Sequence, residues 1–429
     1  MNILEISMKN FRGFESFHAK LHPELTVVVG NNGSGKSTLL DAISIAVGTF
    51  FSGLDGVTAT SIGKEDVTYK CYDMGTVIDL QQQYPSVISA LGTVDNQVIA
   101  WTRSLNSSSG RTTTVDARSI ISIAEQCQSK IRLGDKTVLL PLISYYGTGR
   151  LWAQKKEKKS ADQISQFSRL SGYIDCLAAE SNEKLMLKWF EKMTIQQAQR
   201  GKISPELAAV ENAVSHCFAG ITGTADVATQ FNLDTHTLDI LYTDEIGSKK
   251  RVPMKSLSDG YKNTIGMIAD IAYRMAILNP QLLDDVLVKT PGIVLIDEVD
   301  LHLHPRWQQR IIQDLRSLFP GVQFIVTTHA PSVISSVRKE NLLVLSEEGA
   351  ITSFPAEVYG KDSNSILSGV MNAGRRPVEV QALFDQFYDT LQEEDYDKAK
   401  VELDAIEHLI GPDDPELTDA RVTLALEQI

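Results

Sequence analysis

Residues 25–38 read LTVVVGNNGSGKST, and this stretch decides the fold. Leu25–Val29 is an uninterrupted apolar run, typical of a strand buried on both faces, and it stops at Gly30. The following stretch, Leu39–Val47, is apolar on nearly every side, which predicts a buried helix. Gly30–Ser37 matches the pattern GxxxxGK followed by Ser or Thr, in the strand–loop–helix context that this pattern requires. The sequence therefore predicts a phosphate-binding loop.

This loop carries the residue types that a nucleoside triphosphate needs. Glycines let backbone N–H groups turn toward phosphate oxygens, and the N-terminus of the next helix favours negative charge. We expect Lys36 to neutralise the β- and γ-phosphate oxygens and Ser37 to offer its hydroxyl to Mg²⁺. The expected cofactors are ATP and Mg²⁺, with nucleotide contacts from Asn31, Asn32, Gly33, Ser34, Gly35, Lys36, Ser37 and Thr38.

Two acidic residues end a second apolar strand far downstream, in the sequence GIVLIDE at 292–298. Asp297 suits a magnesium ligand beside the phosphate loop, and Glu298 suits a base that polarises the attacking water. His329 follows the next predicted strand, 322–328, where its imidazole could contact the γ-phosphate. The catalytic candidates are therefore Lys36, Glu298 and His329.

Between these features, residues 257–261 read LSDGY and open an apolar-periodic helix that extends to about Leu278, with Ser258 as its N-cap. The order of phosphate loop, LSxG element, strand ending in Asp-Glu and histidine resembles the head domain of ABC-type ATPases. The opening MKNFRGF at 8–14, which contains Arg12, is similar to the RecF, structural-maintenance and OLD-like branch. The resemblance implies an α/β P-loop fold and head-to-tail dimers, with Arg12 at the nucleotide and Ser258, Asp259 and Gly260 capping the ATP of the partner.

Three further stretches resemble a bacterial subgroup that includes the ATPase of the Septu anti-phage system and its retron-associated relatives. They are ISYYGTGR at 143–150, SDGY at 258–261 and DEVDLHLHP at 297–305. This resemblance implies a homo-oligomer that regulates an HNH nuclease in anti-phage defence. It also implies DNA or retron nucleic acid as a possible binding partner. Asp259 replaces the glycine of transporter-type signatures and places a carboxylate near a phosphate, so we expect slow ATP turnover.

Two assignments remain open within this resemblance. The glutamine that usually senses the γ-phosphate could lie in Gln81–Gln83, or its place could be taken by the stretch Tyr145–Arg150. His302 and His304 could bind a metal, but their place just after Glu298 favours a loop between subunits.

The sequence divides into four predicted regions. Residues 1–150 form an N-terminal ATPase lobe that carries the phosphate loop and an antiparallel β lobe with strands in 65–105. Residues 151–220 form a helical insertion, with an apolar stripe over 164–177. Residues 221–355 complete the ATPase, with a hairpin in 238–254 followed by alternating strands and helices. Residues 356–429 form an acidic helical region.

Charge is concentrated at the end of the chain. Residues 379–429 contain 15 acidic and 3 basic residues, a net charge of −12, while the rest of the chain carries a net charge of −1. Tyr396, Ala399, Leu403 and Ile406, followed by a break at 411–415, predict a helical hairpin like one tetratricopeptide unit. We expect 379–429 to dock a basic nuclease partner or a neighbouring protomer, with a simple helical cap as the alternative.

A second function class remains open. A RecF-like or SMC-like ATPase could clamp duplex DNA directly, using lysines at 155–159 and the basic run 249–251. No nuclease constellation is expected, because Asp395 and Asp397 lie in a charge-rich helical stretch. The four cysteines have no CxxC spacing and no run of 18 apolar residues occurs, so a cytoplasmic, non-membrane protein is expected.

Overall fold

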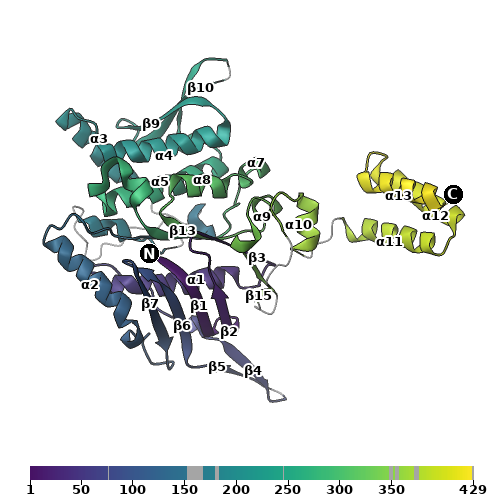
Figure 1. Ribbon diagram of the computed structural model, residues 1–429, viewed down its shortest axis with the longest axis horizontal. Helices are drawn as coiled ribbons and strands as arrows, with labels where there is room; N and C mark the ends of the chain where they lie inside the picture. Colours follow the sequence, from purple (N-terminus) through teal and green to yellow (C-terminus); the bar gives the residue numbers. More distant parts are fainter. Residues whose placement is uncertain are drawn as a thin grey trace. The chain divides into compact units, whose positions relative to one another are not determined.

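The computed structural model describes residues 1–75, 77–151, 168–178, 183–244, 246–346, 351–352, 357–371 and 376–427. The chain divides into two compact units, Met1–Gly360 and Lys361–Ile429. The first unit is called the head below, and the second the C-terminal unit (Figure 1).

A six-stranded sheet forms the centre of the head, and its strands are parallel except for β15 (Ile351–Thr352), which pairs antiparallel with β14 (Leu342–Leu345). The strands in spatial order are β15, β14, β3 (Leu25–Gly30), β13 (Val322–Thr327), β12 (Gly292–Ile296) and β8 (Leu142–Tyr146). Every residue of β3, β8, β12 and β13 is buried, which explains their nearly continuous apolar sequences. The predicted α/β class is confirmed.

The strand order determines which loops meet. β13 lies between β3 and β12, so the phosphate loop after β3, Asp297 after β12 and His329 after β13 leave the same edge of the sheet. Ligands of open α/β sheets bind at the carboxyl ends of the strands. The topology thus gathers residues that are about 300 positions apart in the chain.

A four-stranded antiparallel sheet forms a second layer. Its strands are β2 (Phe14–Lys20), β1 (Asn2–Phe11), β6 (Ser86–Val94) and β7 (Gln97–Leu105), in that order. Helix α1 (Lys36–Gly48) packs against β6 and β7 of this sheet and against β3, β12, β13 and β8 of the central sheet. Because α1 is covered from both sides, its apolar residues are buried nearly all round, and the predicted antiparallel lobe and buried helix are both present.

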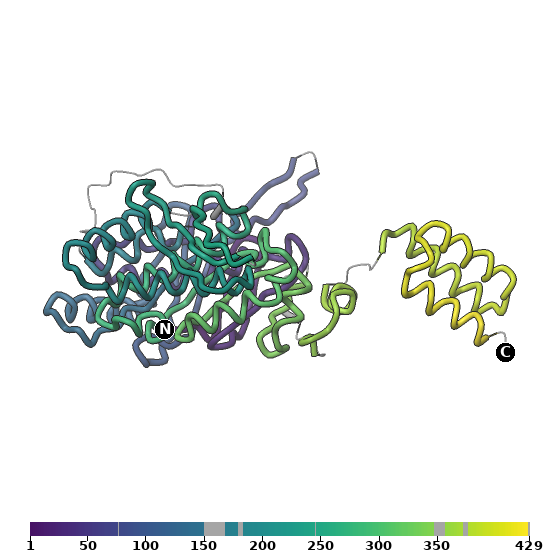
Figure 2. Tube along the Cα trace, turned by 90° about the horizontal axis from the view of Figure 1, so that it is seen from above, coloured from purple at the N-terminus to yellow at the C-terminus, as the bar shows by residue number. Residues whose placement is uncertain are grey.

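A hairpin of β4 (Tyr69–Asp73) and β5 (Ile78–Gln82) extends from this lobe, as Figure 2 shows. Its apolar side chains Tyr69, Tyr72, Ile78 and Leu80 are exposed, and it carries the exposed thiol of Cys71. Helix α2 (Arg118–Arg132) packs against β7 and the short helix Thr49–Gly53 in the same lobe.

Helix α5 (Asp259–Leu278) packs against β8 on the other side of the central sheet, in the upper part of Figure 1. Helices α3 (Glu183–Arg200) and α4 (Pro205–Thr222) pack on α5, together with a three-stranded sheet of β9 (Ala225–Asn232), β10 (Thr237–Thr243) and β11 (Lys249–Pro253). The expected hairpin is therefore part of a three-stranded sheet. Shorter helices complete the head: α6 (Val286–Lys289), α7 (Pro305–Gln308), α8 (Ile311–Leu318) and α9 (Pro331–Ile334).

The predicted helix over 164–177 is wrong where the structure describes it. Arg169–Tyr173 is a 3-10 turn and the residues after it are turns, while 164–167 lie outside the described residues. Burial explains the misleading periodicity, because Leu170 and Tyr173 pack into the head core and the Tyr173 hydroxyl donates to the carbonyl of Pro141 at 2.7 Å.

The C-terminal unit consists of α10 (Ser363–Gly369), α11 (Val378–Gln392), α12 (Tyr396–Ile410) and α13 (Pro415–Glu427) in its described part. The two helices of the predicted hairpin are present as α12 and α13, and α11 adds a third that packs beside α12 (Figure 2). A separate apolar core joins the three helices: Phe384, Phe387, Leu391, Ala399, Leu403, Ile406, Leu417, Ala420 and Leu424.

Candidate active site

The phosphate loop joins β3 to α1 in a conformation that only glycine adopts easily. Gly33 and Gly35 have φ of +84° and +94°, in the left-handed region. A Cβ atom at Gly35 would lie 2.4 Å from the ring of Phe14, and one at Gly30 would lie 2.5 Å from the carbonyl oxygen of Leu345. The spacing of the glycines thus reflects both backbone angle and close packing.

The side chain of Lys36 folds back over this loop. Its Nζ donates to the carbonyl oxygens of Gly30 and Asn31, each at 2.8 Å. Burial lowers the pKa of Lys36, and the charges of Asp297 and Glu298 oppose this shift. The ammonium group is therefore held on the loop by two carbonyls and is influenced by the charges of the two acids.

The open side of the loop is formed by Asn31, Asn32 and Gly33, which are exposed, and by the half-buried Thr38. Ser34 is buried, and among the described residues its Oγ has no hydrogen-bond partner. A buried hydroxyl without a partner is costly in a folded protein. A phosphate group in the loop is the kind of acceptor that would satisfy it.

Asp297 and Ser37 meet at the carboxyl edge of the sheet. The Ser37 Oγ donates to Asp297 Oδ2 at 2.7 Å, across 260 residues of sequence. Both are hard oxygen donors, which suit Mg²⁺. Within the described residues, no group of three or more His, Cys, Asp or Glu side chains is arranged as a metal cage. The donor set fits an ion held by few protein ligands and completed by phosphates and water.

Thr327, at the end of β13, organises both acids and was not predicted. Its Oγ1 donates to Asp297 Oδ1 at 2.6 Å and accepts the backbone N–H of Glu298 at 2.7 Å. Glu298 has φ of +49°, a left-handed angle that is uncommon outside glycine. Strained backbone of this kind is concentrated at functional sites. The pair Thr327–Thr328, directly before His329, is the sequence feature that could have indicated this role.

His329 lies within the electrostatic field of the same residues. Burial is the main cause that lowers its pKa, and the charge of Lys36 lowers it further. The carboxylates of Asp300, Glu298 and Asp297 act in the opposite direction. The lowered pKa favours the neutral imidazole, which has one nitrogen that donates a hydrogen bond and one that accepts.

The LSxG element lies at the start of α5. Ser258 is the N-cap residue, and the Lys262 Nζ is 3.3 Å from the Asp259 carboxylate. A Cβ atom at Gly260 would lie 2.4 Å from the carbonyl oxygen of His302, in the loop that follows Glu298. This element is therefore packed on the loop from Asp297 to His304 of its own chain.

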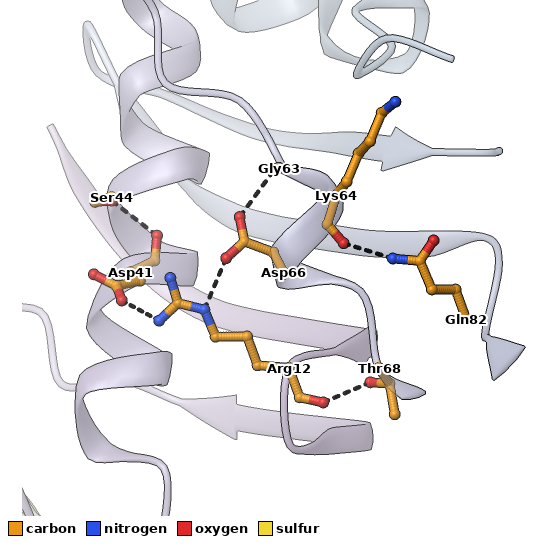
Figure 3. Close-up of polar contacts among 8 residues, drawn as sticks. All are labelled: Arg12, Asp41, Ser44, Gly63, Lys64, Asp66, Thr68 and Gln82. Atoms are coloured by element: carbon orange, nitrogen blue, oxygen red, sulfur yellow. Dashed lines mark hydrogen bonds and ion pairs between the residues drawn. The ribbon is translucent and has the colours of Figure 1, made fainter. Parts of the chain in front are cut away.

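Arg12 is held by two carboxylates, as Figure 3 shows. Its Nε donates to Asp66 Oδ1 at 2.8 Å, and its Nη1 donates to Asp41 on α1. Asp41 also accepts a hydrogen bond from Tyr145, whose pKa is raised by burial. Burial raises the pKa of Asp41 in spite of the Arg12 charge. The arginine that the resemblance places at the nucleotide thus links the end of β1 to the helix behind the phosphate loop.

The two stretches that compete for the place of the γ-phosphate glutamine belong to different strands and have different partners in the structure. Gln82 lies on β5 and donates to the carbonyl of Lys64 at 2.9 Å, at the base of the hairpin (Figure 3). Tyr146, by contrast, ends β8 and accepts the N–H of Asp297 at 2.8 Å. The 145–150 stretch thus borders the acidic edge, and the assignment of the glutamine's place stays a prediction.

The remaining sequence candidates have structural partners. His304 caps α7, its Nδ1 accepting the N–H of Arg306 at 3.3 Å. Arg251 pairs with Asp239 at 2.7 Å and Lys250 lies 3.5 Å from Asp244, so two of the three residues of the basic run 249–251 are engaged. The lysines at 155–159 lie outside the described residues.

Comparison with known proteins agrees with this geometry. Residues 5–215 match a family described as an AAA domain, and residues 158–335 match a family described as "AAA domain, putative AbiEii toxin, Type IV TA system". The chain is 25% identical to the "Retron Ec83 probable ATPase" of Escherichia coli, over 99% of this chain and 86% of the relative. The chain resembles the ABC-type ATPases.

Two further matches are a curated relative and a solved structure. The chain is 28% identical to the Septu protein PtuA of Bacillus thuringiensis, over 52% of this chain and 59% of the relative. A crystal structure of an SMC head bound to the C-winged helix domain of ScpA aligns with 80% of this chain and 94% of that chain, with 16% identity and a TM-score of 0.47. None of the described helices is both long and apolar enough to cross a membrane.

Proposed function

We propose that this ATPase binds ATP with Mg²⁺ at the edge formed by the phosphate loop, Asp297 and His329, and hydrolyses it slowly. The observation that carries the proposal is the 2.7 Å contact of Ser37 Oγ with Asp297 Oδ2, which joins the two predicted metal ligands. Mg²⁺ bound there would neutralise phosphate charge. Lys36, whose side chain folds back over the same loop, would bind the phosphates in place of the carbonyls that it now contacts.

Glu298 would orient and deprotonate the attacking water in this proposal. Its backbone N–H is held by the same Thr327 hydroxyl that donates to the carboxylate of Asp297. His329 would contact the γ-phosphate as a neutral imidazole. Both roles depend on positions that β12 and β13 fix side by side.

The proposal includes a head-to-tail ATP dimer in which Ser258, Asp259 and Gly260 of one copy cap the nucleotide of the other. It is supported by the position of Ser258 at the N-terminus of a 20-residue helix, where a phosphate is favoured. Light scattering on the Glu298→Gln variant with ATP tests it. We expect a dimer or a larger oligomer with ATP, and a strict monomer at micromolar concentration would refute the arrangement.

We further propose that the ATPase regulates an HNH nuclease in anti-phage defence, in the cytoplasm. The names of the retron and Septu relatives support the defence role. The charge supports docking by the end of the chain, because residues 379–429 carry a net charge of −12 and would repel DNA but attract a basic nuclease. The α11–α13 core gives this acidic segment a stable surface of its own.

Removal of residues 376–429 tests the docking proposal. We expect loss of nuclease pull-down with preserved ATP turnover, because this segment contains the whole α11–α13 core. A matched control replaces the exposed acids Glu393, Glu394 and Asp404 by their amides, which changes charge but keeps the core. Association that survives the deletion would place the nuclease on the head, and binding of duplex DNA by the head alone would favour the clamping function.

A further inference from the structure

The head contains a cavity of about 490 Å³ that none of the residues assigned to ATP lines. It opens among the end of α3, the start of α4 and the end of α5. Its polar and aromatic lining includes Arg169, Trp189, Lys192, Gln196, Gln197, Arg200, Lys202, Ser204 and Glu206. This volume is within the range of about 300–1,000 Å³ that small-molecule sites occupy.

The charge of this cavity is unbalanced, with four basic side chains and one acidic side chain in its lining. Within the described residues, Arg169, Arg200 and Lys202 form no ion pair, although the chain as a whole is acidic. Arg169 donates only to neutral oxygens, at 2.7 Å to Leu278 and 2.8 Å to Val138. Glu206 accepts from the Ser204 hydroxyl at 2.8 Å. The side chains that line the cavity therefore carry more positive than negative charge.

A flat aromatic surface accompanies these cations. Trp189 is half-buried, and it packs edge-on against Phe190 and Tyr273 with ring centroids 5.2 and 5.7 Å away. These contacts hold the indole ring in place. Gln196 also lines the cavity, and its side-chain amide is of the kind that hydrogen-bonds to base edges. The side-chain oxygen of Gln197, by contrast, already accepts from the Ser204 N–H at 3.0 Å. Cations beside an aromatic ring are the combination that binds nucleotide units.

We propose that this cavity binds a nucleotide unit, with its phosphate on Arg200 and Lys202 and its base on Trp189. The unit is either a free nucleotide or the end of a nucleic acid strand, since both present the same phosphate and base. The N-terminus of α4, which begins with Ser204 and Pro205, adds a favourable dipole for the phosphate. The site is separate from the ATP site, because it is formed by α3, α4 and the C-terminal end of α5.

The test uses the full chain with Lys36→Ala, so that the phosphate loop is disabled. The probes are ADP and a 5′-phosphorylated single-stranded oligothymidylate, measured by equilibrium binding. The added pair Arg200→Glu with Lys202→Glu should weaken binding by about tenfold or more, because it replaces charge-assisted contacts by repulsion. The matched pair Lys130→Glu with Lys136→Glu, on exposed residues outside the cavity, carries the same charge change and should leave binding intact.

A second measurement locates the base. Probe binding should quench tryptophan fluorescence in the Lys36→Ala chain, and Trp189→Phe should remove that quench. Binding of ADP would identify a free nucleotide as ligand, and binding of the oligothymidylate alone would identify a strand end. The proposal is overturned if neither probe binds, or if the two charge-reversed pairs weaken binding equally. Since Lys36 is absent throughout, neither result bears on ATP hydrolysis at the first site.

Discussion

The active site of the head and the core of the C-terminal unit are built on opposite plans. The site joins Ser37 to Asp297 across 260 positions and Thr327 to Asp297 across 30, and each contact requires the central sheet. Within the described residues of the C-terminal unit, by contrast, the side-chain hydrogen bond with the largest sequence separation joins Arg376 to Glu416, 40 positions apart. Polar chemistry in the head therefore depends on long-range order, whereas the C-terminal unit forms by local packing.

This difference predicts that a substitution in one unit leaves the folding and chemistry of the other unit unchanged. A substitution at the phosphate loop should remove nucleotide chemistry and leave α11–α13 folded. A substitution in the α11–α13 core should unfold those helices and leave nucleotide chemistry in place.

The largest expected effect follows from Lys36→Ala. ATP affinity should fall by about 100-fold or more, because the loop loses the cation that faces the phosphates. Isothermal titration calorimetry with ATP and Mg²⁺ measures the change. Lys20→Ala is the control, since the Lys20 side chain on β2 is 80% exposed. Wild-type affinity in the Lys36 variant would show that ATP does not bind at this loop.

Glu298→Gln should lower ATP turnover by about 100-fold while keeping ATP bound, because the amide cannot accept a proton from water. Asp297 and Ser37 stay in place for the cation. Steady-state phosphate release measures turnover, with Glu340→Gln, an exposed surface substitution, as the control. Turnover at the wild-type rate would assign the catalytic base to another group.

Phe387→Ala probes the other side of the comparison. Phe387 is fully buried between the helices of the C-terminal unit, so its truncation should cost about 3–5 kcal/mol of unfolding free energy of that unit. Limited proteolysis in urea should release the helices early while ATP turnover is unchanged. The exposed Val401→Ala is the control. A loss of ATP turnover in the Phe387 variant would contradict independence of the two units.

Arg376→Gln should give the smallest effect, about 1 kcal/mol at pH 7. Arg376 contacts both oxygens of Asp414, at 2.9 and 2.6 Å, and its hydrogen bond is the main cause that lowers the pKa of Asp414. This stabilisation is present above the ordinary aspartate pKa and is lost as the pH falls through the lowered value. Urea unfolding should separate the variant from wild type at pH 7 and bring the two together in strong acid. An equal difference at both pH values would exclude the ion pair as the cause.

The sequence predicted those parts of the fold that local pattern controls. A recognisable sequence pattern within each element predicted five features. They are the phosphate loop, the buried helix α1, the strand β12 that is followed by two acids, and the helices α12 and α13. The pairings that join them carry no such pattern, so the role of Thr327 was missed. Helix α11 was missed although Phe384, Phe387 and Leu391 recur at helical spacing. The stripe over 164–177 was misleading, because an apolar period of three to four residues also fits turns that pack into a core.

The network around Arg12 shows the same limit at the site. Its partners Asp41 and Asp66 are 29 and 54 positions away, in a helix and a turn. Isolated acids in a sequence give no sign that they face one arginine. Only the packing of α1 against the antiparallel sheet brings them together.

The projecting β4–β5 hairpin has a practical consequence for spectroscopy. The thiols of Cys127, Cys176 and Cys217 are buried, and burial raises the pKa of each, so they react slowly with maleimides. Cys71, on the hairpin, is exposed. The wild-type chain can thus receive a single fluorophore on the hairpin without any engineered cysteine, and that dye would report directly when another molecule covers the hairpin.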